Sequence, residues 1–327
     1  MKLAARLAVE VAFMKAILLA LVLPFALVAP AARAGLAPYS SLVVADANAR
    51  APADRGGVRI TYLGVNGYQL EAGRHALLID PYFTRVGLTH VAFGQPIEPD
   101  TGRVAAGLGH VRPQVDAVLV THAHFDHLLD VPEVMRRTGS RLVAGPTAVN
   151  LVRALGIPSS RCLVAKPGEQ RRIGPWRITV LRAEHDRVLG PNPPFPGRVP
   201  YPASPPQRPS DYKLGEPLAF VIEANGQRIY VDSGGLPGTP LPQAGRIDLA
   251  IVGVALPDSR RRFPELVRSL RPRYVLPSHQ DDFFAPFDRG FSFGKMTGFP
   301  GLLQTAERER LPGRLILLDY FRPWTLR

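Results

Sequence analysis

The stretch that decides the fold is residues 117–127, Ala-Val-Leu-Val-Thr-His-Ala-His-Phe-Asp-His. Its first five residues form the short apolar run of a buried strand. Four potential metal ligands follow: His122, His124, Asp126 and His127. Side chains at i and i+2 leave a strand on the same side, so His122 and His124 should converge on one point. The following turn would carry Asp126 and His127 toward a second point. Because paired metal ions ~3.5 to 4 Å apart form a known catalytic arrangement, the motif predicts a metal centre at a strand end.

Three further potential ligands stand at the ends of runs typical of strands. They are His185, Asp232 and His279. Binding and catalytic groups gather where strands end, because rigid elements position them while loops give access. We therefore expect these three side chains to join the same centre. The remaining histidines have no such setting and are expected at the surface or behind the site: His75, His90 and His110.

From residue 58 onward, short β-rich runs alternate with turns and then with helical patterns. Turn residues at 66–67 and 73–74 predict hairpins at the start of an antiparallel sheet. Asp130 and Glu133 have capping-box spacing, and residues 82–113 show no regular pattern. This order predicts two packed sheets flanked by helices. Strands are expected at 58–65, 68–72, 75–81, 117–121, 141–145, 162–166, 176–183, 218–224, 228–233, 248–254, 273–278 and 314–319, and helices at 131–137, 146–155, 262–271 and 300–310.

The ligand pattern resembles that of the metallo-β-lactamase fold superfamily of metallohydrolases. The likeness runs from about Val58 to Asp319 and includes Asp80 in the usual upstream strand. It implies an α+β fold, a four-layer αββα sandwich built as a single domain by residues 35–327, with the metals at one edge between the sheets. The matching residues stand in the family's order: His122-x-His124-x-Asp126-His127, then His185, Asp232 and His279.

By the same resemblance, the enzyme is expected to hold two Zn²⁺ ions. The iron-dependent flavoprotein branch has Glu at the place of His124, although Mn²⁺, Fe or Ni²⁺ could bind the same donors. A hydroxide between two Zn²⁺ ions exists at neutral pH because the metals lower the pKa of water to ~7. Asp126 would be the catalytic residue that orients this nucleophile and carries a proton. The implied ligands are His122, His124 and His185 for the first ion and Asp126, His127 and His279 for the second, with Asp232 as the bridge.

The surroundings of the motif are more similar to the lactonase and N-acylphosphatidylethanolamine phospholipase D-like branch than to true β-lactamases. The similarity rests on residues 126–130 (DHLLD), residues 76–83 (ALLIDPYF) and Arg187. It implies hydrolysis of a phosphodiester, lactone or related ester in a small or lipid-like anionic molecule. The alternative is a β-lactamase or acyl-thioester hydrolase that uses the same metals. The expected substrate contacts are Arg187, Phe283 and Phe284.

Two irregular segments allow two interpretations each. Residues 283–299 hold six Phe, among them Phe287, Phe291 and Phe293, which either form an apolar rim with Phe283 and Phe284 or only pack the loop onto the core. Residues 191–209 hold nine prolines, which exclude a helix or a central strand. Long irregular loops are often functional, so this segment is either a lid or a surface excursion.

Residues 1–34 have the pattern of a secretory signal peptide. Lys15 precedes an uncharged apolar run at 16–30, and Ala32-Arg33-Ala34 predicts cleavage near Ala34/Gly35, whether the chain starts at Met1 or Met14. An uncleaved anchor is the alternative, but the run is shorter than the ~20 residues of a spanning helix. We therefore expect a periplasmic or secreted protein of bacterial type, with no stable membrane span after cleavage.

Composition limits the other classes of function. The chain has 327 residues and a formal net charge of +13, and 35 of its 40 basic residues are Arg. No block of five or six consecutive basic residues and no nucleic-acid-binding motif accompanies this charge, so no nucleic acid is expected as a partner. The lone Cys162 rules out an intramolecular disulfide and a cysteine-rich zinc site. Cys162 is expected in the core, and Ser233 and Ser278 are expected in turns.

Overall fold

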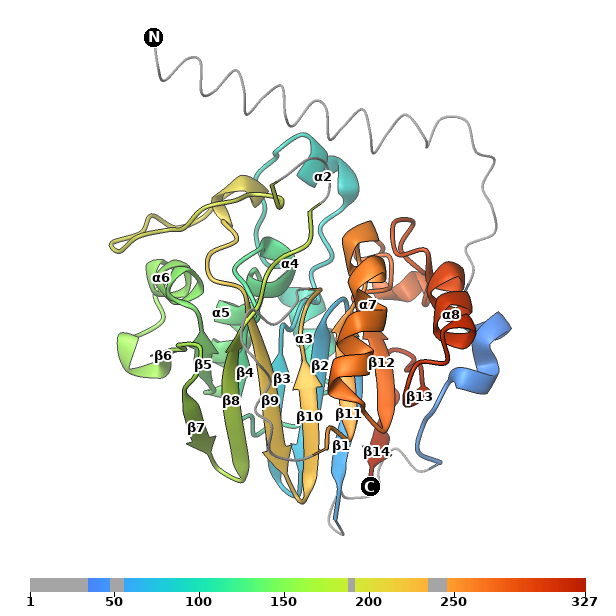
Figure 1. Cartoon of the computed structure of the whole chain (residues 1–327). Coiled ribbons are helices and arrows are strands. Elements are labelled where there is room, and N and C mark those ends of the chain that lie inside the picture. Colours follow the sequence, from blue (N-terminus) through green and yellow to red (C-terminus); the bar gives the residue numbers. More distant parts are fainter. Residues whose placement is uncertain (1–34, 48–55, 188–191, 235–245) are drawn as a thin grey trace.

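The computed structural model describes residues 35–47, 56–187, 192–234 and 246–327; the predicted signal peptide lies outside these residues. Within the described ranges, no helix is long and apolar enough to cross a membrane. Two seven-stranded mixed sheets pack face to face, with helices on both outer faces (Figure 1). The predicted four-layer αββα sandwich is confirmed.

The first sheet has the strand order β14-β1-β2-β3-β4-β5-β6. Strands β1, β2 and β3 form antiparallel hairpins, as predicted, and β3 to β6 run parallel. Parallel pairing places the carboxyl ends of β3 and β4 at the same edge. The strands are β1 (Val58–Gly64), β2 (Gly67–Ala72), β3 (His75–Ile79), β4 (Ala117–Leu119), β5 (Arg141–Ala144), β6 (Cys162–Val164) and β14 (Trp324–Leu326).

The second sheet repeats this plan, with the order β13-β12-β11-β10-β9-β8-β7. Strands β7 to β10 pair antiparallel and β10 to β13 pair parallel. The carboxyl ends of β10, β11 and β12 therefore share one edge. The strands are β7 (Gln170–Ile173), β8 (Trp176–Arg182), β9 (Leu218–Ala224), β10 (Gln227–Val231), β11 (Leu249–Gly253), β12 (Tyr274–Ser278) and β13 (Arg314–Leu315).

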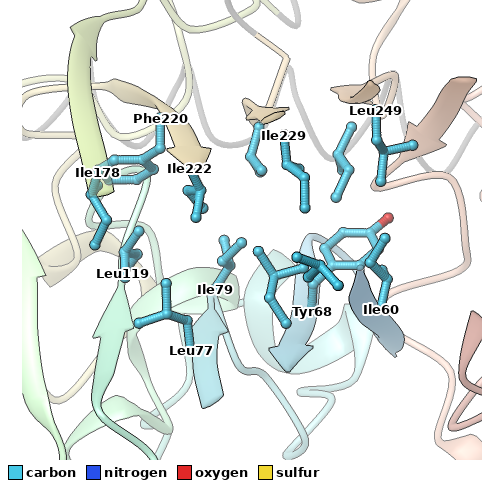
Figure 2. Close-up of a cluster of buried hydrophobic side chains, with 14 of the residues drawn as sticks. Ile60, Tyr68, Leu77, Ile79, Leu119, Ile178, Phe220, Ile222, Ile229 and Leu249 are labelled. Carbon is cyan, nitrogen blue, oxygen red and sulfur yellow. The ribbon is translucent and has the colours of Figure 1, made fainter. Parts of the chain in front are cut away.

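Apolar side chains fill the space between the sheets. Leu77 and Ile79 of β3 belong to the same buried cluster as Ile229 of β10 and Phe220 of β9 (Figure 2). Alternate residues of these strands face the outer helices, so the strands are buried on both faces. This explains their nearly continuous apolar sequences.

Helices cover both outer faces. Val134 of α5 and Leu151 of α6 pack in one cluster with Val118 of β4, and Phe263 of α7 packs in another with Ala250 of β11. The α-helices are α2 (Leu88–Ala92), α3 (Thr101–Leu108), α4 (Phe125–Leu128), α5 (Val131–Thr138), α6 (Pro146–Ala154), α7 (Pro257–Leu270) and α8 (Phe299–Arg308). The 3₁₀ helices are η2 (Ala37–Leu42), η3 (Ser159–Arg161), η4 (Pro209–Asp211) and η5 (Phe287–Arg289).

Several local predictions were wrong. The region 82–113 contains α2 and α3, and α3 begins at an N-cap in which the Asp100 carboxylate accepts a hydrogen bond from the Arg103 N–H. Strands β7 and β14 were missed, and α7 begins five residues before its predicted start. The predicted strand 314–319 keeps regular pairing only over β13. Such short elements depend on tertiary contacts that the local pattern does not contain.

Two side chains also differ from their predicted roles. Asp130 makes no capping hydrogen bond to α5. Its carboxylate instead accepts hydrogen bonds from the N–H groups of Phe83 (2.6 Å) and Thr84 (2.8 Å). Cys162 is half-buried at the start of β6 rather than in the core.

Candidate metal centre

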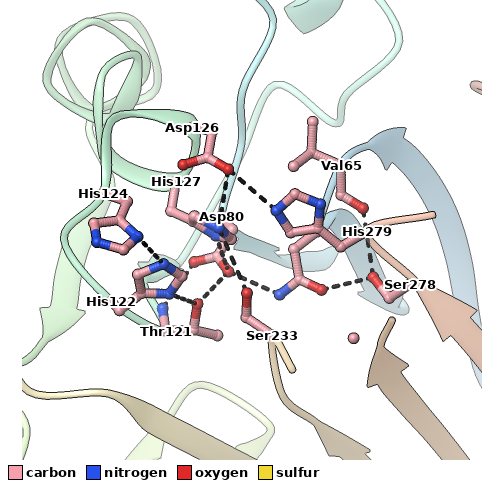
Figure 3. A network of polar contacts seen from close by, with 12 residues as sticks. Val65, Asp80, Thr121, His122, His124, Asp126, His127, Ser233, Ser278 and His279 are labelled. Carbon is pink, nitrogen blue, oxygen red and sulfur yellow. Dashed lines mark hydrogen bonds and ion pairs between the residues drawn. The ribbon is translucent and has the colours of Figure 1, made fainter. Parts of the chain in front are cut away.

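The predicted ligands come from strand ends of both sheets. His122, His124, Asp126 and His127 lie in the segment after β4 of the first sheet, with Asp126 and His127 on the short helix α4. His185 and His279 follow strands β8 and β12 of the second sheet. Figure 3 shows the residues after β4 beside His279 at this edge. The structure thus assembles six of the seven predicted ligands into two groups.

The first group consists of His122, His124 and His185. One ligand atom from each lies within 4.8 Å of those of the other two. The Nε2 atom of His122 is 2.9 Å from Nδ1 of His124. Two nitrogens bound to one tetrahedral Zn²⁺ at 2.0–2.1 Å would be roughly 3.3 Å apart, so this spacing suits a single small cation. His122 and His124 are buried, and His185 is half-buried.

The second group consists of Asp126, His127 and His279, all buried and within the same distance of one another. The Oδ2 atom of Asp126 lies 3.1 Å from Nε2 of His279 and 3.5 Å from Nε2 of His127. The rings of His122 and His127 are 4.0 Å apart between centroids. The two groups therefore lie side by side.

Hydrogen bonds hold the outer nitrogens of four imidazoles. A hydrogen bond of 2.8 Å joins Nδ1 of His127 to the Asp80 carboxylate, and one of 2.9 Å joins Nε2 of His124 to the Pro194 carbonyl oxygen. Nδ1 of His185 is hydrogen-bonded to the Asp186 carbonyl oxygen (2.7 Å), and Nδ1 of His122 is hydrogen-bonded to Thr121 Oγ1 (3.2 Å). Such partners fix the tautomer and ring orientation of metal-binding histidines. In His122, His124 and His127 the other nitrogen is the one that faces a neighbouring ligand of the same group.

Asp80 is the main partner behind the site. Its carboxylate is fully buried and accepts hydrogen bonds from the Thr121 N–H (2.8 Å), the Thr121 hydroxyl (2.6 Å) and the Asn66 amide (2.8 Å), besides its contact with His127. The sequence placed Asp80 in the upstream strand but did not predict this role. The available signal was its position directly after β3, the neighbour of β4.

The electrostatics of both groups suit a divalent cation. Burial, reinforced by neighbouring imidazoles, holds the pKa of His122 and His124 well below the usual value, and burial lowers the pKa of His185 to about 3. Burial alone would raise the pKa of Asp126, but His127 and His279 hold it below its usual value. Burial alone would lower the pKa of His127, yet Asp126 and Asp80 raise it. Mostly neutral imidazoles and an ionised carboxylate are the donors that metal binding requires.

Asp232 belongs to neither group, although the resemblance implies that it bridges them. Its Oδ1 accepts hydrogen bonds from the N–H groups of Gly234 (3.0 Å) and Gly253 (2.9 Å), and its Oδ2 accepts one from the Tyr230 hydroxyl (2.9 Å). Burial raises the pKa of Asp232 to about 6. The structure thus shows this buried carboxylate with three hydrogen-bond donors, and its role as a bridging ligand stays a prediction.

A cavity of about 470 Å³ opens onto both groups. Phe283 and Phe284 line it, as do Pro194 and Phe195 of the proline-rich segment, which thus forms part of its wall. Arg187 is not among its lining residues and borders a smaller recess of about 100 Å³. Sequence reasoning missed two further lining residues, Lys213 and Lys295, because they stand alone in irregular segments.

The other predicted rim residues pack away from this cavity. Phe287 contacts Phe321 and the Arg85 guanidinium, and Phe293 stacks on Phe299. Thus Phe283 and Phe284 belong to the apolar wall of the cavity, whereas Phe287 and Phe293 pack the loop onto the rest of the protein. His75, His90 and His110 contribute to neither candidate metal group, and His75 pairs with Asp116.

Comparison with known proteins agrees with this geometry. Residues 59–279 match the model of a family described as a Beta-lactamase superfamily domain. A UPF0173 metal-dependent hydrolase of Rubrobacter xylanophilus is 29% identical over 235 residues, which cover 70% of this chain and 84% of that protein. The metallo hydrolase Igni18 of Ignicoccus hospitalis has a TM-score of 0.53 and 18% identity over 83% of this chain and 98% of its own. The metallo-beta-lactamase fold protein YhfI of Bacillus subtilis has a TM-score of 0.54 and 14% identity over 83% of this chain and 100% of its own.

Proposed function

Because this chain belongs to the beta-lactamase superfamily and is a metal-dependent hydrolase, we propose that it is a dinuclear zinc enzyme that cleaves a phosphodiester, lactone or related ester. The observation that carries the proposal is the pair of three-residue ligand groups, lying side by side and opening onto one cavity. A pair of adjacent metal ions is a known arrangement for hydrolysis at a carbonyl or phosphoryl centre.

The side chains of the site have separate roles in metal binding, proton transfer and substrate contact. His122, His124 and His185 would hold one ion, and Asp126, His127 and His279 the other. When bound, the ions supply Lewis-acid activation of the substrate and of water at neutral pH. Asp126 directs Oδ2 toward His127 and His279, and we assign proton transfer to its Oδ1. The side chains of Phe283 and Phe284 supply an apolar part of the cavity wall.

The cavity wall supports an anionic substrate with an apolar part. It combines Phe195, Phe283 and Phe284 with two ammonium groups, those of Lys213 and Lys295. Only five lysines occur in the whole chain against 35 arginines, so two on one cavity are notable. A lysine ammonium binds a phosphate or carboxylate as a compact point charge. These features favour the lactonase and phospholipase D-like branch.

The predicted leader supports a site of action outside the cytoplasm. Residues 16–30 are apolar and are followed by Ala32-Arg33-Ala34. We propose export and cleavage near Ala34/Gly35, with action in the periplasm or outside the cell. Zinc is the proposed metal because the groups contain five imidazoles and a carboxylate, and Mn²⁺ or Fe could replace it.

Metal content and substrate preference test this function together. The purified protein should bind two Zn²⁺ ions per chain and hydrolyse a bis-aryl phosphodiester or a lactone faster than nitrocefin or an acyl-thioester. The reverse preference would support the lactamase or thioesterase alternative. His124→Ala and Asp126→Asn should each lower kcat/KM by more than about 100-fold, because each removes a ligand. The control is His110→Ala, which changes an exposed histidine stacked on Phe321. Full activity in His124→Ala would contradict the assignment.

A further inference from the structure

Two polar side chains of the cavity wall lie on one turn, directly after the proline-rich segment. They are the Ser210 hydroxyl and the Lys213 ammonium, and both residues line the 470 Å³ cavity. Both are half-buried. Among the residues that the structure describes, none forms a hydrogen bond or ion pair with either side chain. The turn therefore offers a hydroxyl and a positive charge to a molecule in the cavity.

The acidic groups around Lys213 have other partners. The Oδ2 atom of Asp211 accepts hydrogen bonds from the backbone N–H groups of residues 207 and 208, at 3.0 and 2.9 Å. Glu216 pairs with Arg198 at 3.1 Å. Two carboxylates of the cavity wall are also paired with arginines: Asp186 with Arg262 and Asp281 with Arg85. The charge of Lys213 is thus left for a ligand.

Backbone hydrogen bonds fix this turn beside the first ligand group. The Leu214 N–H donates to the Phe195 carbonyl oxygen (2.9 Å), and the Leu214 carbonyl oxygen accepts from the Ala123 N–H (3.1 Å). Ala123 stands between two ligands of that group in the sequence. The Tyr212 side chain is buried in the cluster that contains α5 and α6. Because the chain is held on both sides of Lys213, little order has to be gained when a ligand binds.

The charge and the surroundings of the turn favour a carboxylate as its ligand. One lysine supplies a single positive charge, which matches a carboxylate, whereas a phosphate monoester carries about −1.5 to −2 at neutral pH. Pro194, Phe195 and Pro196 make the adjoining wall apolar, and an ion pair is stronger where the local dielectric constant is low. Lys213 belongs to neither metal group, which are the place of the scissile bond in the proposed function.

We propose that Ser210 and Lys213 form a carboxylate subsite, and that the substrate carries a carboxylate separate from the phosphodiester, lactone or ester group that is cleaved. This inference rests on the proposed function and narrows its substrate class. The carboxylate takes no part in bond cleavage. It positions the substrate in the cavity while its scissile group lies at the metal groups.

Matched esters test the subsite in the zinc-loaded protein. Mono-4-nitrophenyl adipate and suberate carry a carboxylate at the far end of the chain, and 4-nitrophenyl hexanoate and octanoate have the same lengths without it. In at least one pair, the wild type should hydrolyse the carboxylated ester with a kcat/KM about 10–100-fold higher. Equal values within both pairs would overturn the inference.

Variants of the turn show which side chains carry this preference. Lys213→Met should abolish it, Lys213→Arg should keep part of it, and Ser210→Ala should lower it about 3–10-fold. The rate with the neutral esters should stay near that of the wild type. Lys166→Met is the matched control, because Lys166 is exposed and lies outside the cavity lining; it should keep the full preference. A preference that survives unchanged in Lys213→Met would contradict the assignment.

Binding measurements separate this inference from the proposed function. Calorimetric titration of the zinc-loaded protein with adipate and with hexanoate reports the second carboxylate without any turnover. The wild type should bind adipate at least about 10-fold more tightly, and Lys213→Met should lose most of this difference while it keeps two zinc ions per chain. Equal binding of the two acids by the wild type would refute the subsite. A wild type that binds adipate in this way but cleaves no ester, lactone or phosphodiester would instead refute the proposed function.

Discussion

At the scale of single residues, the centre depends on what lies behind each ligand. The ligands themselves follow from sequence, because four of them stand in one short motif after an apolar run. Their partners do not: Asp80 lies 47 positions before His127, and Pro194 lies 70 positions after His124. Only the packed chain brings these atoms together. The contacts of Asp232 were likewise absent from the local pattern, because two of its donors belong to the backbone.

Asp80→Asn tests the support of His127. The amide keeps most of the shape but removes the negative charge that fixes the Nδ1–H tautomer, so metal affinity should fall about 10–100-fold. Competition with a chromogenic chelator measures the dissociation constants. Asp116→Asn is the matched control, because Asp116 pairs with His75 at 3.1 Å at the opposite end of β3 and β4, outside both groups. Equal affinities in the Asp80 variant and the wild type would contradict this prediction.

Asp130 should make stability depend on pH. Burial raises its pKa to about 6, so between pH 4 and 6 the folded protein binds a proton that the unfolded chain has lost. Because the native state then binds more protons, stability falls as pH rises through this window, by about 3 kcal/mol for the full shift. Above pH 6 the contribution is constant. The difference in urea-unfolding free energy between wild type and Asp130→Asn should therefore decline from pH 4 to 7; a constant difference would refute this titration.

At the scale of elements, apolar strands were the easiest part to predict and short helices the hardest. The apolar sequences of β1 to β5 and β8 to β12 indicate strands without any information from distant residues, because both faces of each sheet are buried. Helices α2 and α3 have five and eight residues. Their amphipathic pattern spans too few turns to stand out from the glycines and threonines around it.

The packing of α3 can be tested at a glycine. A Cβ on Gly107 would overlap the ring of Phe83, so Gly107→Ala should destabilise the fold by about 1–3 kcal/mol through overpacking. Gly301 in α8 is the matched control, because a Cβ there has no atom within 4 Å. Gly301→Ala should be neutral or stabilise by about 0.5–1 kcal/mol through helix propensity. Urea unfolding of both variants gives the comparison, and equal effects would contradict the overlap.

At the scale of the whole molecule, the two sheets are joined beside the metal centre by a buried ion pair. Arg85 follows β3 of the first sheet, and Asp281 follows β12 of the second; their side chains meet at 2.7 Å with no exposed surface. The Tyr320 hydroxyl and the Val65 N–H also donate to Asp281. The sequence predicted two packed sheets but not this link, since neither residue stands in a recognisable motif.

Removing Arg85 should weaken the whole sandwich. Arg85→Met leaves the Asp281 carboxylate buried without its cation, which should lower the unfolding free energy by about 3–5 kcal/mol. The control is Arg177→Met, which removes a solvent-exposed pair with Glu223 at 3.8 Å and should cost less than about 1 kcal/mol. Chemical denaturation of both variants at neutral pH measures these values. Similar losses in the two variants would show that the buried pair does not hold the sheets together.

Each ligand group takes residues from both sheets, and this has a consequence for maturation. Before the two sheets dock, each group has only the two ligands of the motif at 122–127, so tight metal binding must follow the docking. The ion acquired is then decided by the compartment where folding finishes. Refolding in a defined mixture of cations would reproduce that choice in the test tube.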